Sequence, residues 1–177
     1  MTFSDVLEKV LSIINELDID LMEEGDKRNR LIEAGIATYQ ELTNEYINLK
    51  AEEEVEFTEG VLYYSLLSKK VKDILSIKQG GANLNFEMYP LFVKCKVEGK
   101  AQVKYFYSAE TPALDSHLEL PPRFTDYLIA NGIASEYFYR SGLLDEAAYY
   151  RNKFDYSLKN ISSRLRGLNL KVDKMIC

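Results

Sequence analysis

The spacing of apolar residues changes twice along the chain, and this change constrains the fold more than any other sequence feature. Residues 1–50 and 122–167 place apolar side chains every three or four positions, which is typical of helices with one buried face. Residues 55–107 instead alternate apolar and polar positions in short runs, which is typical of strands. We therefore predict an α+β fold: a helical body, made of two N-terminal helices and a C-terminal helical hairpin, with an inserted small antiparallel β region.

The last predicted helix carries the longest apolar stripe. Pro122 is suited to open the preceding helix and Gly142 to end it. The stripe then steps by three or four residues through Ala147, Tyr150, Phe154, Leu158, Ile161, Leu165 and Leu168. Such near-heptad spacing predicts a long helix packed along another helix. We expect one domain over residues 1–167, followed by a C-terminal tail, residues 168–177.

Within the β region, the clearest expected hairpin joins residues 91–97 to residues 101–107 through a turn at Gly99. Gly80 and Gly81 predict another turn. The run Glu52-Glu53-Glu54 precedes the first alternating segment and predicts an acidic strand edge, which would discourage edge-to-edge pairing.

The composition is that of a folded domain. Of 177 residues, 46% are hydrophobic and 28% charged, which argues against a disordered chain. No apolar run approaches the roughly 18–20 residues of a membrane span, and the N-terminus lacks the pattern of a secretory signal. The two cysteines, Cys95 and Cys177, predict free thiols in a reducing compartment. We expect no membrane association.

Charge is distributed unevenly along the chain. Residues 1–60 hold 5 basic and 16 acidic side chains, whereas residues 151–177 hold 7 basic and 2 acidic ones. An acidic end and a basic end would steer the docking of stacked parts in an assembly. Solvated helix faces are the alternative interpretation. A nucleic-acid reader is disfavoured, because such domains are usually strongly basic and this chain has a net charge of -6.

No residue pattern predicts catalysis. His117 is the only histidine and lies in a proline-containing connector. Structural zinc needs four nitrogen or sulfur ligands, and the acidic run from Asp18 to Asp26 departs from the calcium-loop pattern because its glycine is displaced. We therefore expect a non-enzyme without cofactor or metal. A small metal-dependent hydrolase using the acidic loops remains an alternative.

The aromatic residues are unusually clustered. The chain has 13 Tyr, 8 Phe and no Trp, and several lie next to one another, as in Tyr63-Tyr64, Tyr137-Phe138-Tyr139 and Tyr149-Tyr150. Consecutive residues of a helix or strand cannot all face one core. We expect some of these rings to lie at the surface or under another chain, where tyrosine is favoured. Burial by a flanking helix is the alternative.

The second half of the sequence resembles the head–tail connector (adaptor) proteins of tailed bacteriophages. Residues 120–138 contain a proline-ended loop and a helix with small residues before Glu136-Tyr137. Residues 141–154 contain a glycine turn, an acidic helix start with Glu146-Ala147-Ala148, and an aromatic–basic helix. Residues 99–107 are similar to the strand that precedes this layout in the family. The resemblance covers roughly residues 60–165.

The resemblance implies a structural virion protein of the phage neck, assembled in the host bacterial cytoplasm. Its copies would form a homo-oligomeric ring, typically twelve-fold, beneath the portal protein. A neck or tail protein, a stopper or tail-tube protein, would dock below, and DNA would pass through the lumen. An acidic chain suits this passage, because an acidic lumen does not bind a polyanion.

Family members also use a C-terminal extension to reach the portal, and the matching segment here is the tail. Its predicted partner-binding residues are Leu168, Leu170, Lys171, Val172, Lys174, Met175 and Ile176. The apolar members would insert as anchors while the lysines stay polar. The alternative function is a cellular helical adaptor that binds peptides or partner helices in a groove lined by tyrosines.

Overall fold

A computed structural model describes residues 1–16, 19–21, 23, 25–97 and 99–172. These residues form two compact units. The helical unit contains residues 1–41 and the chain from residue 111 onward, and the β unit contains residues 42–110. Whether the chain behaves as one cooperative domain, as we predict for residues 1–167, stays a prediction.

The first helix of the helical unit, α1, spans Phe3–Ile14. Thr2 caps it: the Thr2 side chain accepts from the Asp5 amide, and the Asp5 carboxylate accepts from the Thr2 amide at 2.7 Å. This reciprocal pair satisfies two amides that a helix start leaves unbonded. The connector before α3 is hydrogen-bonded to the start of α1, because the backbone amides of Phe3 and Ser4 donate to the carbonyl oxygens of Ser116 and Leu114.

Helix α2 spans Asp26–Glu41 and crosses α1 closely at Gly35. A Cβ atom at Gly35 would lie 2.6 Å from the Phe3 ring, so only glycine lets the two helices approach this far. The second helix was predicted to continue to Lys50. It ends at Glu41 instead, where a π-helical turn, η1 (Leu42–Tyr46), opens the β unit.

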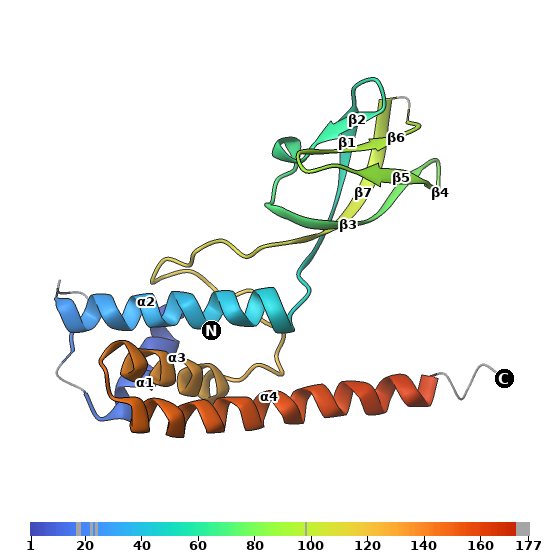
Figure 1. Cartoon of the computed structure of the whole chain (residues 1–177). Coiled ribbons are helices and arrows are strands. Elements are labelled where there is room, and N and C mark those ends of the chain that lie inside the picture. The colour runs from blue at the N-terminus through green and yellow to red at the C-terminus, as the bar shows by residue number, and fades with distance from the viewer. Residues whose placement is uncertain (17–18, 22, 24, 98, 173–177) are drawn as a thin grey trace. The chain divides into compact units, whose positions relative to one another are not determined.

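Helix α3, Asp126–Arg140, is the central helix of this unit (Figure 1). It packs against α1, α2 and α4, and nearly every residue from Leu128 to Phe138 is buried. Gly132 lies where α2 and α4 approach, since a Cβ there would be 2.7 Å from Thr38 and 2.8 Å from Phe154. The helix starts four residues later than the predicted Pro122, because the side chain of Thr125 provides the N-cap.

Helix α4 spans Leu144–Val172 and runs back along α3 after a tight turn at Gly142, whose φ is +77°. The predicted stripe is buried at Ala147, Phe154 and Leu158. The backbone stays helical through Leu168 to Val172.

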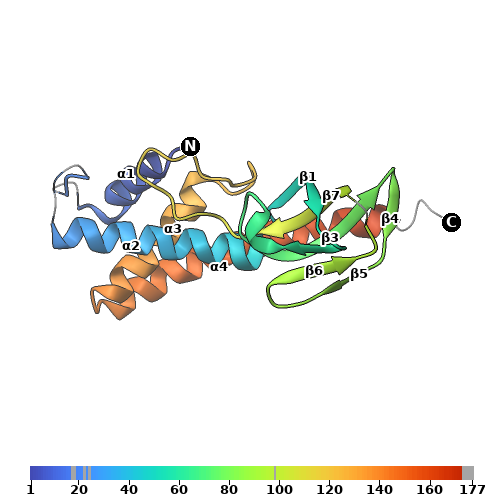
Figure 2. The same cartoon turned by 90° about the horizontal axis from the view of Figure 1, so that it is seen from above.

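The β unit contains two antiparallel sheets (Figure 2). The four-stranded sheet has the order β1-β7-β3-β4 and the three-stranded sheet the order β2-β6-β5. The strands are β1 (Lys50–Phe57), β2 (Val61–Tyr63), β3 (Val71–Gln79), β4 (Ala82–Leu84), β5 (Phe86–Met88), β6 (Phe92–Cys95) and β7 (Gly99–Tyr107), with a 3-10 turn, η2, at Tyr64–Leu66. Both sheets bury side chains in one core.

The predicted fold class was wrong in its arrangement. One small β region with a hairpin of residues 91–97 and 101–107 was expected, but β6 and β7 belong to different sheets. β7 pairs with β1 and β3, and β6 pairs with β2 and β5. This arrangement lets Val93 of β6 and Val103 of β7 reach one core from both sheets, which a single exposed hairpin cannot do.

Two smaller features follow the sequence. Gly80 and Gly81 form the β3–β4 turn with φ values of +58° and +85°, the two left-handed positions of a type I′ hairpin turn. β1 lies at an edge of its sheet, and Glu52 and Glu54 form ion pairs with Lys104 and Lys100 of β7, at 3.4 and 3.8 Å. These pairs are exposed and contribute little to stability.

Candidate interaction surfaces

The predicted partner-binding residues fall in two parts of the chain. Leu168, Leu170, Lys171 and Val172 belong to the end of α4. Lys174, Met175 and Ile176 lie outside the described residues. By helical spacing, positions 168 and 172 continue the face of Phe154 and Leu158, whereas position 170 falls on another face. The role of these residues in binding a partner stays a prediction.

Helix α4 is much longer than the helix that covers it. It has 29 residues, against 15 in α3. At about 1.5 Å per residue, roughly 20 Å of α4 extends past the end of the α3–α4 hairpin, and this continuation is visible in Figure 1. Within the helical unit, the apolar positions in the last half of α4 therefore lie beyond the part of α4 that runs alongside α3.

One flank of the α3–α4 hairpin forms a groove, here called the hairpin groove. Its volume is about 360 Å³, and it is lined by Ser135, Glu136, Tyr139, Leu144, Ala147, Ala148 and Arg151. The buried Ser135 hydroxyl donates to the Ala147 carbonyl at 2.9 Å and ties the helices together beneath it. Tyr139 and Leu144 are 64% and 62% exposed, so this groove has an apolar rim open to solvent.

The hairpin groove forms because small residues lie where α3 and α4 pack closely together. Ala147 and Ala148 present only methyl groups on α4, and Ser135 faces them from α3. The sequence signal was present in Glu146-Ala147-Ala148, which supported the family resemblance, but periodicity indicated only that Ala147 belongs to the buried face of the helix. A groove needs the neighbouring large side chains to lie beside the small ones, and only the packing of the two helices establishes that.

A second surface, here called the tyrosine face, consists of Tyr127, Tyr149, Lys153 and Tyr156. Tyr149 is 56% exposed and Tyr156 68%. The Lys153 ammonium lies 4.2 Å from the Tyr149 ring centroid and 5.5 Å from that of Tyr150, within the range of cation–π attraction. A hydrogen bond to Tyr149 and the nearby phenol of Tyr127 raise the pKa of Lys153, so this ammonium stays charged.

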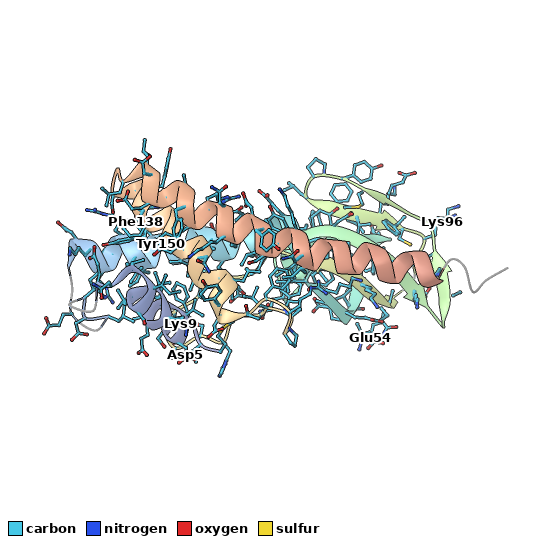
Figure 3. The ribbon with its side chains drawn as sticks, turned by 90° about the horizontal axis from the view of Figure 1, so that it is seen from below. Asp5, Lys9, Glu54, Lys96, Phe138 and Tyr150 are labelled. Carbon is cyan, nitrogen blue, oxygen red and sulfur yellow. The ribbon has the colours of Figure 1, made fainter. Side chains whose placement is uncertain are left out.

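The clustered tyrosines divide between core and surface, as predicted from their positions in sequence. Tyr150 turns inward and stacks on Phe138 with ring centroids 5.6 Å apart, and both residues are labelled in Figure 3. Its hydroxyl donates to the Ile13 carbonyl of α1 at 3.2 Å, and burial raises its pKa. Its neighbour Tyr149 faces solvent. Tyr137 and Tyr139 divide in the same way.

The β unit has an aromatic cluster of its own. The ring of Phe92 in β6 stacks on that of Tyr89, with ring centroids 4.7 Å apart, and its centroid lies 5.8 Å from that of Tyr63 in β2. Tyr63 is half exposed, and Leu91 beside the cluster is mostly exposed. The Tyr89 hydroxyl donates to Glu87 at 2.9 Å, which raises the Tyr89 pKa.

The residues considered for catalysis take structural positions. The Cys95 thiol is buried and donates to the Asn85 carbonyl at 3.2 Å, and burial raises its pKa, which favours the unreactive thiol. His117 is exposed and forms an isolated bridge with Thr2. Among the described residues, no group of three or more His, Cys, Asp or Glu side chains could hold a metal ion. None of the described helices is long and apolar enough to cross a membrane.

Comparison with protein-family models and with curated proteins found no match to this chain. The resemblance to head–tail connectors therefore stays a proposal, supported by the residue pattern and by the surfaces described above.

Proposed function

We propose that the chain is a non-enzymatic structural adaptor of a tailed-phage neck. In this proposal, several copies form a ring beneath the portal protein, a neck or tail protein docks below, and DNA passes through the lumen. The observation that carries the proposal is the excess length of α4, because a helix with apolar positions beyond its own hairpin is suited to bind another chain.

The helical hairpin supports the same proposal. The stretch that resembles the connector family, residues 120–154, supplies the central helix α3 and the first half of α4. Around it, the hairpin groove and the tyrosine face expose apolar surface in the helical unit. Exposed tyrosines with a neighbouring cation are common in protein–protein interfaces, where large rigid rings combine contact area with a polar group.

The first experiment is affinity purification of the tagged full chain from its native source. Co-purifying chains would be identified by mass spectrometry, and the particles would be imaged by negative-stain microscopy. We expect a portal-like or tail protein and ring-shaped particles. Recovery of ordinary cellular partners without rings would contradict the adaptor proposal.

A substitution pair tests how the end of α4 takes part. If it docks as a helix, Leu168→Asp removes portal co-purification, whereas Leu170→Asp, on another face, preserves most of it. Deletion of residues 168–177 is expected to abolish attachment while leaving the cooperative thermal unfolding of the remaining chain intact. Equal losses for both substitutions would contradict docking as a helix, and loss of cooperative unfolding in the deletion would contradict a binding role for the tail.

The hairpin groove favours one alternative, a cellular adaptor that binds peptides. Its small-residue floor and exposed Tyr139 and Leu144 fit a short apolar segment. The same purification separates the two functions, since a peptide-binding adaptor recovers cellular proteins and forms no ring.

A further inference from the structure

The hairpin groove has an unusual electrostatic rim. The two charged residues that line it, Glu136 and Arg151, each belong to a cluster of ion pairs. Arg140 lies 3.0 Å from Glu33 and 2.8 Å from Glu136. Arg151 binds Glu41 at 2.7 Å and Asp155 at 3.1 Å.

Together the two clusters hold four carboxylates and two guanidiniums, a net charge of about -2 beside the groove, because each arginine offsets only one of its two partners. The Arg151 pKa is raised, chiefly by its hydrogen bond to Glu41, so its charge is fixed. An apolar floor with an anionic rim selects a segment that combines aliphatic side chains with positive charge.

The chain itself contains such a segment. Residues 162–172 carry Arg164, Arg166 and Lys171 and no acidic residue. By helical spacing, Ile161 and Leu165 fall on one face of α4, beyond the α3–α4 hairpin. We infer that residues 161–166 of α4 dock in the hairpin groove of a second copy of this chain.

The second copy is required by the geometry of α4. The groove takes its α4 residues from Leu144 to Arg151, and the docking segment begins at Ile161 on the same continuous helix. Ile161 lies ten positions after Arg151, about 15 Å along the helix axis, and a continuous helix cannot bring its end back to its start. The segment can therefore reach only another molecule's groove, and this head-to-tail contact repeats from copy to copy until a ring closes.

This inference rests on the proposed function in one respect: it assumes that copies lie side by side. It leaves the tail, residues 168–177, available for the portal, so the two contacts can be tested separately.

The test is a binding titration with a matched pair of variants. A fluorescein-labelled synthetic peptide with the sequence of residues 158–172 is titrated with the full chain, and binding is followed by fluorescence anisotropy. Ala148→Arg places a cationic side chain in the groove, and Ala113→Arg makes the same substitution in the connector before α3, outside the groove lining. Both positions are exposed, so both variants are expected to fold.

We expect saturable binding that Ala148→Arg weakens by about tenfold or more and Ala113→Arg changes by less than about twofold. A peptide carrying Arg164→Glu and Arg166→Glu should lose binding, and raising ionic strength from about 0.1 M to about 1 M should weaken the wild-type complex.

No saturable binding, or equal effects of the two variants, would overturn the inference. If Ala148→Arg reduces co-purification of the portal but does not affect peptide binding, the groove serves the portal instead, which overturns this inference and leaves the proposed function standing. If the affinity purification recovers neither a portal protein nor rings while the peptide still binds, the proposed function is refuted and this inference stands.

Discussion

Gly60 is the position where the β unit tolerates a side chain least. It joins β1 to β2 with φ at +75°, and a Cβ atom would lie 2.5 Å from the Cys95 carbonyl oxygen of β6. The Cys95 amide donates to the Gly60 carbonyl at 2.8 Å, so the two backbones are bonded and cannot separate freely. For Gly60→Ala, the left-handed conformation costs about 1–2 kcal/mol and displacement of packed backbone about 1–3 kcal/mol more.

Gly80→Ala supplies the matched control for this prediction. Gly80 has a similar φ, +58°, but no atom lies within 4 Å of its Cβ position, so only the conformational cost applies. Urea unfolding followed by far-ultraviolet circular dichroism should show a lower midpoint for both variants, with an unchanged slope. Gly60→Ala should be less stable than Gly80→Ala by about 1–3 kcal/mol. Equal losses would refute the reasoning, because they would mean that the close approach to Cys95 costs nothing.

Three further predictions address the helical core and two pH-dependent groups. Phe154→Ala should destabilise the chain by about 3–5 kcal/mol in urea unfolding, because this ring is fully buried, whereas Tyr156→Ala, on the exposed side, should change it by less than about 0.5 kcal/mol. A hydrogen bond from the Thr2 backbone amide, with a smaller contribution from the Thr2 side chain, lowers the Asp5 pKa. The stability that this carboxylate contributes is therefore present above pH of about 4 and lost as pH falls further, and Asp5→Asn should flatten the acid limb of a melting-temperature profile. Burial, with a hydrogen bond to Glu53, raises the Tyr105 pKa, so the stability that this neutral phenol contributes is lost as pH rises above about 10. Tyr105→Phe should therefore show a shallower loss of melting temperature at alkaline pH than the wild-type chain, and an unchanged alkaline profile would contradict this account.

Most helices could be predicted from sequence because their signal is local. The stripe from Ala147 to Leu158 becomes the buried face of α4, and Gly142 forms the turn before it. The Gly80-Gly81 turn was recognisable for the same reason: left-handed φ values favour glycine whatever surrounds it. Helix boundaries were less certain, because a cap such as Thr125 competes with several neighbouring residues that could serve equally well.

Strand pairing could not be predicted in this way. β6 and β7 are adjacent in sequence and have hairpin-like spacing, but β7 pairs with β1, about fifty residues earlier. The choice depends on how much apolar area each arrangement buries. Placing β6 and β7 in opposite sheets buries Val93, Cys95, Val103 and Tyr105 together in one core, and no local pattern records that gain.

The candidate surfaces divide along the same line. The sequence alone established that adjacent tyrosines must separate between core and surface, that the chain has acidic and basic ends, and that its last helix is long and apolar on one face. The tertiary structure decided that Ser135, Ala147 and Ala148 meet between larger side chains to form a groove, and that Arg151, which lines it, is held by two carboxylates. Periodicity along one helix determines which residues share a face, whereas a groove and its charge depend on residues from three helices that only packing brings together.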